Sequence, residues 1–537
     1  MQGIPLLLLA LTVLYVVRKL LSYWNALRAI QNLPGYRVLF RDDSAMSFLG
    51  SIPGVAPGFN SFFQDKHSGA PLFHYAPQDE CPLTKLNYTR SHLSLQGVGY
   101  DVDAFATADA DVIKEITSSR FRFPKPVEQY IGLSMYGYNI VASEGEDWKK
   151  YRKITAPAFS DRNNKLVWDE TAKIMDGLFN EVWKNQDVIT VDHCLDITLP
   201  IALFVIGVAG FGKTMTWDDA DQGIPSGHRL SFKDSLHTAS VDVTIKLLFP
   251  NWLLKYGTPR LRKVKLAYEE LGVYMAEMVQ DRITSEKIER HDLFTNLLEA
   301  NDDDSDGVRL TTDELIGNIF IFLLAGHETA AHTLCFTFAL LALYEEEQEK
   351  LFQHIKITLP DGRMPSLLRN IAPIPTCLYI YATNQLQLNN NSQAPLIPKI
   401  SAEDTALTVG NIHGQKRTVP VAKGTRVTIH CPGLHYNPRY WDEPESFKPS
   451  RFLKPDWNRD AFLPFSAGAR ACLGRKFFET EGIAVLTMLV LRYKISIKDE
   501  PEFLGETFEQ RYKRIFKAYT RLTLTPERVP LTFTRRS

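Results

Sequence analysis

One cysteine in this sequence stands where a glycine-containing loop runs into a predicted helix. The loop reads Phe-Ser-Ala-Gly-Ala-Arg-Ala-Cys-Leu-Gly and places Cys472 between Gly468 and Gly474, directly before a helical pattern that begins at Arg475. Free backbone N–H groups at a helix start and the positive end of the helix dipole both stabilise a thiolate. A thiolate is the form of cysteine that acts as a nucleophile and binds metal ions. We therefore predict that Cys472 is the chemically active cysteine.

The other five cysteines lack such surroundings. A lone cysteine is usually a small, buried, apolar side chain. The chain contains no Cys-x-x-Cys pair, so neither a zinc ribbon nor a disulfide framework is indicated, and reduced thiols in the cytosol are expected. These five residues are Cys81, Cys194, Cys335, Cys377 and Cys431.

A second candidate site is a carboxylate beside a hydroxyl in a strongly apolar helix pattern. Glu328 and Thr329 follow Gly326 and the uninterrupted apolar run 319–324. A helix that is apolar on every face is buried, so its polar residues need an explanation. Together a carboxylate and a hydroxyl can deliver protons in a dry site. Alternatively, both side chains bond backbone carbonyls and Gly326 permits a kink.

A third candidate pair is Trp148 and Arg152, which are four residues apart and share one face of a predicted helix. An indole N–H and a guanidinium group are suitable donors to a carboxylate. Without context, however, they read as a core residue and a surface residue.

Basic side chains cluster near these segments. They could form a binding surface for an acidic partner, or simply a solvated face. They are Lys149, Lys150, Lys153, Arg475 and Lys476.

The elements that must position these residues are mainly helices. Periodicity predicts long helices at 165–184, 261–290 and 313–343, and short strands at 407–409, 417–419 and 426–429. No repeat or linker of biased composition divides the chain beyond residue 35. We expect a mainly α fold with small β-sheets, formed as one domain by residues 32–537.

Composition limits the possible partners. Hydrophobic residues make up 45% of the chain and charged residues 23%, which is typical of a globular protein. The 61 Lys and Arg nearly cancel the 62 Asp and Glu, so the chain lacks the basic excess of a nucleic-acid-binding protein.

The first 31 residues are predicted to be a membrane anchor. Residues 4–17 carry no charge, Leu20 to Trp24 could supply the interfacial end, and positive charge follows at Arg18, Lys19 and Arg28. This charge distribution predicts one transmembrane helix with the catalytic domain in the cytosol. A cleaved signal peptide is the alternative, but no basic segment precedes the apolar run and no small-residue cleavage site precedes Arg18.

The Cys472 loop resembles the haem-binding loop of cytochrome P-450 enzymes, Phe-x-x-Gly-x-Arg-x-Cys-x-Gly. The resemblance implies haem b (iron protoporphyrin IX) as cofactor, with Cys472 as the iron ligand. It also implies that Phe465, Gly468 and Gly474 shape the loop.

Two further segments resemble the same family. Ala-Gly-His-Glu-Thr is similar to its oxygen-binding helix, which implies that Gly326 opens a groove for dioxygen, Thr329 hydrogen-bonds the oxygen and Glu328 feeds protons. The Trp148 segment is similar to the region that binds a haem propionate, which implies that Trp148, Arg152 and Arg470 bind this group.

The resemblance implies a monooxygenase that inserts one oxygen atom of dioxygen into an apolar organic substrate, which could be a secondary metabolite, a lipid or a xenobiotic. In the family, regions corresponding to 120–141 and 231–252 line the substrate pocket. Electrons would come from an NADPH-cytochrome reductase that docks on the basic face. The N-terminal anchor and the motif sequences resemble those of fungal microsomal cytochrome P-450 enzymes. This resemblance implies single-pass attachment to the endoplasmic reticulum membrane.

One family motif is absent. The family carries Glu-x-x-Arg on a helix after the oxygen helix, and these two residues pair with a later arginine, here Arg451. The sequence contains no Glu-x-x-Arg, and 370–402 holds neither Glu nor Arg. Pro373, Pro375 and a run of Asn residues also disfavour a helix in this segment. We therefore expect weak haem binding.

Three alternative hypotheses follow from these features. The chain could be an inactive remnant of the family that holds little haem, or a gene model with a misassigned exon boundary. It could also be a haem-thiolate isomerase or dehydratase, although such chemistry does not require the proton-delivering pair Glu328 and Thr329.

Overall fold

The computed structural model describes residues 104–217, 224–284, 291–302, 309–359, 396–410, 416–444, 446–520 and 523–536. It also describes residues 10, 13, 14, 17 and 18 and the short strands β1 (Arg37–Val38) and β2 (Thr89–Arg90). The chain forms two compact units. The first comprises Met1–Pro126, Ala394–Ser446 and Asp456–Ala471, and the second comprises Val127–Gln393, Phe447–Pro455 and Cys472–Ser537.

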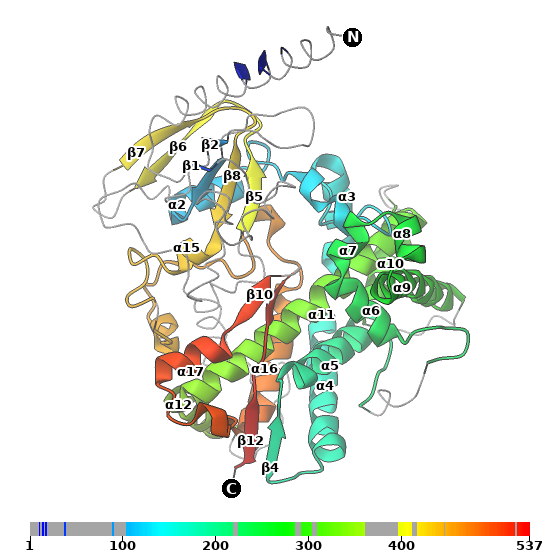
Figure 1. The fold of residues 1–537 in the computed structure, drawn as a ribbon, viewed down its shortest axis with the longest axis vertical. Coiled ribbons are helices and arrows are strands. Elements are labelled where there is room, and N and C mark those ends of the chain that lie inside the picture. The colour runs from blue at the N-terminus through cyan, green and yellow to red at the C-terminus, as the bar shows by residue number, and fades with distance from the viewer. Residues whose placement is uncertain are drawn as a thin grey trace. The chain divides into compact units, whose positions relative to one another are not determined.

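Helices dominate the second unit (Figure 1). Its α-helices are α3 (Gly145–Thr155), α4 (Asp161–Gly177), α5 (Leu195–Val205), α6 (Phe232–Val241), α7 (Val243–Leu248), α8 (Asn251–Tyr256), α9 (Pro259–Thr284), α10 (Leu293–Asp302), α11 (Thr312–Leu343), α12 (Glu345–Thr358), α16 (Arg475–Arg492) and α17 (Phe508–Ile515). Shorter helical turns are η2 (Val127–Leu133), η3 (Ala156–Ala158), η4 (Leu178–Val182), η5 (Ile206–Gly210), η9 (Pro449–Leu453) and η12 (Pro501–Phe503).

Helix α11 lies at the centre of this unit, where it packs against α5, α12 and α16. It begins with a capping box, in which the Thr311 hydroxyl accepts from the backbone N–H of Glu314 and the Glu314 carboxylate accepts from that of Thr311. Most of the residues that follow are apolar and buried on every side. Burial of this apolar surface holds α11 in the core, because apolar groups gain free energy when they leave water.

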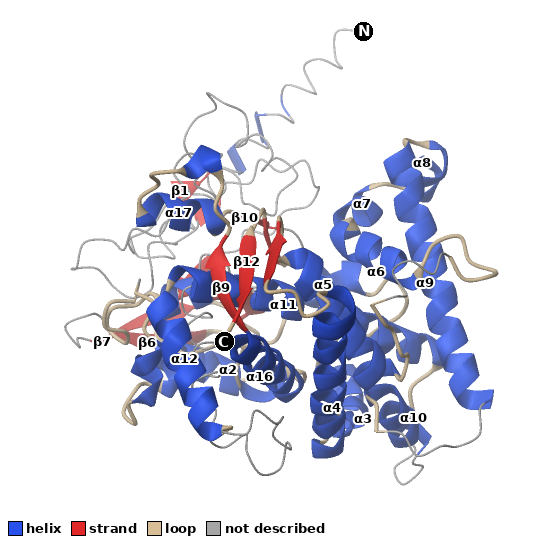
Figure 2. Cartoon of the chain, turned by 90° about the horizontal axis from the view of Figure 1, so that it is seen from below, coloured by secondary structure: helices blue, strands red, loops and turns tan. Residues whose placement is uncertain are grey.

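Two small antiparallel sheets complete the second unit. One has the order β4 (Val188–Val191), β12 (Leu531–Arg535), β9 (Tyr493–Ile497), and its strands are drawn in red in Figure 2. The other is a hairpin of β10 (Ala518–Thr520) and β11 (Leu524–Pro526), in which Thr520 pairs with Leu524. This register places Thr523 in the turn between the two strands.

The first unit contains the remaining sheets. Strand β8 (Arg426–His430) pairs in parallel with β3 (Ala104–Thr107) and antiparallel with β5 (Leu396–Ile400). A hairpin of β6 (Thr405–Gly410) and β7 (Lys416–Val421) lies in the same unit. The helical elements are α2 (Ala110–Ser118), α15 (Cys431–His435), η10 (Arg459–Ala461) and η11 (Gly468–Arg470).

A buried aspartate ties the elements of the first unit together. One oxygen of Asp109 caps α2 by accepting from the backbone N–H groups of Asp111 and Val112. The other oxygen accepts from the Gly410 N–H and from the Arg439 guanidinium, both at 3.1 Å. A buried carboxylate needs such donors, because an unpaired charge in the interior is costly.

The fold confirms the predicted mainly α class with small sheets. Helices α4, α9 and α11 overlap the three predicted long helices, and strands β6, β7 and β8 contain the three predicted strands. All three helices begin one to four residues before the predicted position, and α4 and α9 also end six or seven residues before it. Capping residues such as Ser160, which caps α4, set the actual start of a helix.

The predicted anchor lies almost entirely outside the described residues, and the domain boundary after residue 31 stays a prediction. Among the described residues, one helix, α11, is long and apolar enough to cross a membrane. However, 78% of its most apolar stretch is buried inside the protein, as in the core helix of a globular domain.

Candidate active site

The Cys472 side chain is exposed, whereas the described cysteines Cys194, Cys335 and Cys431 are buried. Cys472 stands two residues before Gly474, the residue that caps the start of α16. The backbone N–H groups of Gly474 and Arg475 both direct hydrogen bonds to its sulfur. The predicted arrangement of a cysteine among free N–H groups at a helix start is therefore present.

Opposing effects act on the Cys472 thiol. Although Cys472 is exposed as a residue, burial of its thiol group by the surrounding protein is the largest effect and raises its pKa. The two N–H groups and the positive charges of Arg152 and Arg475 lower the pKa but do not outweigh the burial. The loop alone thus favours the neutral thiol, whereas a coordinated metal ion would deprotonate it outright.

The other loop residues named by the sequence belong to the end of the first unit. Gly468 adopts a φ of +68°, and a Cβ there would lie 2.2 Å from the backbone oxygen of Thr117. Only glycine tolerates both conditions, so Gly468 is required for the close approach of the loop to α2. Phe465 and Arg470 are partly buried in the same unit.

Gly474 is less constrained. A Cβ at this position would lie 3.9 Å from the Cys472 sulfur, at ordinary contact distance. The implied role of Gly474 in shaping the loop is not tested by this contact and stays a prediction.

Helix α3 carries Trp148 and Arg152, which belong to the second unit, as Cys472 does. Trp148 is buried and Arg152 is partly buried. Burial lowers the pKa of Arg152, and its interaction with Cys472 opposes this effect. The electrostatic effect is mutual, which places the guanidinium group near the sulfur, as expected for one contiguous site.

One face of α11 is not covered by protein. Ala325 is exposed, and Phe322, Gly326 and Thr329 are partly exposed, in a helix whose other residues nearby are buried. These positions are three or four residues apart and so lie on one face. The Thr329 hydroxyl donates to the backbone oxygen of Ala325 at 2.6 Å, as the alternative interpretation expected.

Gly326 has a packing role that the sequence did not reveal. A Cβ on this residue would lie 3.1 Å from the Cδ1 atom of Ile206 in η5. The glycine therefore permits close approach between η5 and α11. Its predicted role in opening a groove for dioxygen is not tested by this contact.

Glu328 points away from the uncovered face, although it is the neighbour of Thr329. Its carboxylate is buried and accepts from the Thr523 hydroxyl at 3.3 Å, and Thr523 also lies 3.0 Å from Nδ1 of His332. Sequence reasoning missed Thr523 and His332. His332 lies one helical turn after Glu328 and could have been noticed, whereas nothing local indicates Thr523.

His327 is a second residue that the sequence analysis left without a role. It is buried, and burial together with the nearby His237 and His332 lowers its pKa to about 3. The imidazole is therefore neutral at physiological pH. It contributes no charge to α11.

The predicted basic dock is partly neutralised. Lys149 pairs with Glu146 at 2.5 Å, Lys150 with Glu314 at 2.7 Å, and Arg475 with Glu479 at 2.8 Å. Lys153 and Lys476 are exposed. Because several of these cations already have acidic neighbours, the cluster is a weaker electrostatic feature than its composition indicated.

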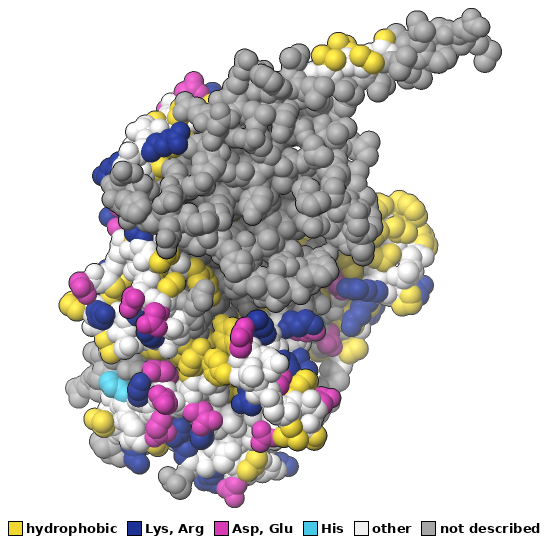
Figure 3. Space-filling view, turned by 60° about the vertical axis from the view of Figure 1, so that its left-hand side comes forward, with side chains coloured by type: hydrophobic (Ala, Val, Ile, Leu, Met, Phe, Trp, Pro, Cys, Tyr) yellow, Lys and Arg dark blue, Asp and Glu magenta, His cyan; other side chains and the backbone are white. Residues whose placement is uncertain are grey.

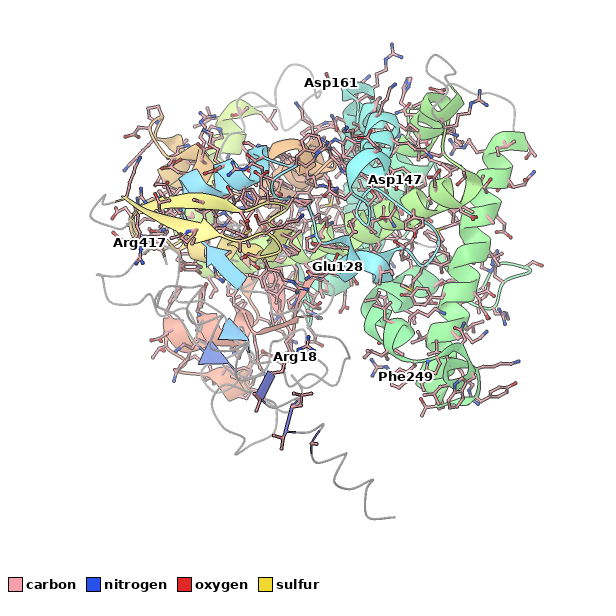
Figure 4. The ribbon with its side chains drawn as sticks, turned by 90° about the horizontal axis from the view of Figure 1, so that it is seen from above. Arg18, Glu128, Asp147, Asp161, Phe249 and Arg417 are labelled. Atoms are coloured by element: carbon pink, nitrogen blue, oxygen red, sulfur yellow. The ribbon has the colours of Figure 1, made fainter. Side chains whose placement is uncertain are left out.

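The α7–α8 region carries exposed apolar side chains. Leu248, Trp252 and Tyr256 are exposed, and Phe249, labelled in Figure 4, lies where the two helices join. Figure 3 shows a group of uncovered hydrophobic side chains at one edge of the molecule. Part of the stretch 231–252 therefore faces solvent.

The segment 370–402, which holds neither Glu nor Arg, lies outside the described residues up to residue 395; its last residues form β5 and the two positions after it. Arg451 is described: it lies in η9, and its Nε donates to the backbone oxygen of Lys448 at 3.2 Å. The expectation of weak haem binding is not tested by this contact and stays a prediction.

Comparisons with known proteins agree with this geometry. The family model described as Cytochrome P450 matches residues 102–372 and 405–511. The unmatched interval includes most of the segment that lacks Glu-x-x-Arg. The crystal structure of the cytochrome P450DA heme domain is similar with a TM-score of 0.65 and 22% identity, over 83% of this chain and 90% of that one, which supports the fold alone.

Two fungal proteins are similar in sequence. Cytochrome P450 monooxygenase 124 of Postia placenta is 48% identical over 100% of both chains, so that alignment also spans the unmatched interval. Cytochrome P450 monooxygenase ORF6 of Penicillium roqueforti is 30% identical over 72% of this chain and 73% of its own. The chain therefore belongs to the cytochrome P450 family of haem b monooxygenases.

Proposed function

We propose that Cys472 is the haem-iron ligand of this monooxygenase and that the enzyme inserts one oxygen atom of dioxygen into an apolar organic substrate. The observation that supports the proposal most directly is the combination of exposure and nearby donors and cations at Cys472. This cysteine is exposed, unlike the other described cysteines, and two N–H groups and two guanidinium groups act on its sulfur. Hydrogen bonds to the sulfur and positive charge near it are the means by which a protein tunes a thiolate ligand.

The residues present fit haem b. Cys472 is an exposed cysteine that can supply a thiolate ligand, and Arg152 offers a positive charge that acts on its sulfur. Along α11 the uncovered side chains are small or apolar, which suits contact with a flat, apolar macrocycle. When bound, haem supplies the reductive activation of dioxygen.

Thr329 and Glu328 would have different roles in proton delivery. Reduction of one oxygen atom to water consumes two protons, and a side chain positioned for proton transfer accelerates such a step by about 10²–10⁴-fold. Thr329 lies on the uncovered face and can present its hydroxyl to the reacting oxygen once it leaves the Ala325 carbonyl. Glu328 is buried directly beside it and can hold a proton away from solvent.

Trp148 and Arg152 would bind a haem propionate. Both are on α3, and one indole N–H with one guanidinium group supplies charge-assisted hydrogen bonds to a carboxylate. Arg470 is expected from the sequence to join them. Gly468 and Phe465 would shape the loop before the ligand, with Gly468 doing so through its positive φ.

We further propose that an NADPH-cytochrome reductase supplies the electrons and that residues 1–31 anchor the protein in the endoplasmic reticulum membrane. Lys476, four residues after Cys472 in the sequence, is exposed on α16, and Lys153 is exposed on α3, the helix that carries Arg152. An acidic partner could bind such exposed cations. The uncharged run 4–17 supports the anchor.

Two measurements test this function. The full chain in lipid vesicles, reduced and exposed to carbon monoxide, should show the strongly red-shifted Soret band of thiolate ligation. With reductase, NADPH and isotopically labelled dioxygen, a panel of apolar lipids and terpenoids should yield a product that carries one labelled oxygen atom. A protein that binds no haem, or that yields only unlabelled products, would contradict the proposal.

A further inference from the structure

The carboxylate of the proton-handling pair belongs to a longer buried chain of hydrogen bonds. Thr523, from the turn between β10 and β11, is 3.3 Å from the Glu328 carboxylate and 3.0 Å from Nδ1 of His332. The three side chains are 4%, 6% and 3% exposed for Glu328, Thr523 and His332 respectively. These hydrogen bonds therefore connect two ionisable groups, Glu328 and His332, through one hydroxyl group that is buried away from solvent.

The position of this chain is set by two parts of the second unit. Glu328 and His332 are four residues apart and share a face of α11, while Thr523 comes from a hairpin that is 195 residues distant from Glu328 in sequence. Other threonines of α11, such as Thr333 and Thr337, donate instead to the carbonyl one turn earlier. Thr523 therefore differs from these buried threonines, because its hydroxyl bonds two ionisable side chains and not a backbone carbonyl.

The hydroxyl restricts where protons can lie. A threonine hydroxyl carries one hydrogen, so when it donates to the Glu328 carboxylate it can only accept from Nδ1–H of His332. When Glu328 is protonated and donates to the hydroxyl, the hydroxyl donates to a bare Nδ1. The two arrangements have the same net charge if His332 is an imidazolium in the first and a neutral imidazole in the second.

We infer that Thr523 is a positioning residue for oxygen activation, through which Glu328 and His332 share one transferable proton. The hydrogen of Thr523 moves to Glu328 while the Nδ1 hydrogen of His332 moves to Thr523, so one O–H and one N–H bond break and two O–H bonds form, with no change in oxidation state. Glu328 is thereby reloaded after it has given up its proton. The inference rests on the proposed function, because it needs Glu328 to deliver protons to the uncovered face of α11.

The test compares three variants with the wild-type holoenzyme. Thr523→Val keeps the shape but removes the hydroxyl, and Thr523→Ser restores it. Thr525→Val is the matched control, because Thr525 is buried in the same hairpin and pairs with Tyr519. All four proteins should show the same thiolate-type Soret band with carbon monoxide, which checks the proposed function separately.

The functional readout is the amount of peroxide released per NADPH consumed, with reductase and without added substrate. Peroxide is the expected product when oxygen is reduced without timely proton delivery. Thr523→Val should raise the ratio of peroxide to water by about tenfold, since a positioned proton donor typically contributes about 10²–10⁴-fold. Thr523→Ser and Thr525→Val should stay near the wild-type ratio. A wild-type ratio in Thr523→Val, or an equal rise in Thr525→Val, would overturn the inference.

A second readout does not depend on turnover. Nitrogen NMR of ring-labelled histidine reports whether Nδ1 of His332 is protonated and hydrogen-bonded, with His332→Asn used to assign the signal. Thr523→Val should change this signal, and Thr525→Val should not. An unchanged His332 signal in Thr523→Val would show that the hydroxyl does not connect the two groups, even if the monooxygenase itself is confirmed.

Discussion

Cys472 and Cys431 are chemically identical and both stand at the start of a helix, yet their surroundings differ. Cys431 opens α15 and is buried, and burial raises the pKa of its thiol to about 12. Cys472 precedes α16, is exposed, and has two guanidinium groups acting on it in addition to backbone N–H groups. A helix start alone therefore does not make a metal ligand. Access and nearby positive charge distinguish the two.

The same difference separates two threonines of α11. Thr329 and Thr333 both donate to the carbonyl one turn earlier, at 2.6 and 2.7 Å. Thr333 is buried, whereas Thr329 is partly exposed on the uncovered face. Local hydrogen bonding is the same in both, so only access marks Thr329 as a residue that can meet a reactant.

Apolar segments can be compared in the same way. Helix α11 is apolar and buried in the core, whereas the described N-terminal residues Val13 and Leu14 are 54% and 66% exposed. Exposed apolar side chains in a long uncharged run are expected to enter a lipid bilayer. Each of these three comparisons predicts an experiment.

The largest effect is expected from the two cysteines. Cys472→His should abolish the thiolate-type Soret band of the reduced carbon monoxide complex, because an imidazole cannot replace the thiolate. Cys431→Ala should keep the band and lose only about 1–2 kcal/mol of stability, as is usual for a small core truncation. If the band survives in Cys472→His, the ligand has been assigned to the wrong cysteine.

Deletion of residues 1–31 should have the next largest effect. The truncated protein should move from the membrane fraction to the soluble fraction after cell lysis, or bind vesicles weakly through Phe249 and Trp252. Sedimentation with and without carbonate washing measures this change. Integral membrane behaviour of the truncated protein would mean that a second anchor exists, and α11 would then need to be reconsidered.

The two threonines predict a smaller, graded effect. Thr329→Ala should retain haem but raise peroxide release per NADPH by about tenfold, because proton delivery to the oxygen becomes disordered. Thr333→Ala removes the same kind of hydrogen bond and should leave this ratio unchanged. Equal ratios in the two variants would remove Thr329 from the mechanism and assign it a structural role in α11.

Much of the fold could be predicted because it rests on local patterns. The long apolar run of α11 and the alternation of apolar and polar residues in β6, β7 and β8 can be recognised in short windows of sequence. The candidate residues Cys472 and Thr329 were also visible, since each occurs in a short, unusual combination of residue types.

Features that depend on distant contacts could not be predicted. Thr523 approaches Glu328 only because a hairpin near the C-terminus packs on α11, and Gly326 faces Ile206 only because η5 crosses this helix. The net rise in the pKa of Cys472 was also unexpected. The sequence indicated the donors that lower it, but the extent of burial depends on the whole fold.

The smallest predicted effect concerns the charge beside the ligand. Arg152→Gln removes one of the two cations that lower the pKa of Cys472, so in haem-free protein this pKa should rise further above its ordinary value. Because the thiolate is the reactive form, alkylation of Cys472 by iodoacetamide at pH 8 should slow by less than about tenfold, and its rate should increase at higher pH than in the wild type. Cys431 should remain unreactive in both proteins, since a thiol with a pKa of about 12 is almost entirely protonated at pH 8. Mass spectrometry of labelled peptides measures both rates in one sample. Lys153→Gln, on the exposed side of the same helix, is the matched control, and an equal slowing there would mean that general surface charge, rather than Arg152, acts on the sulfur.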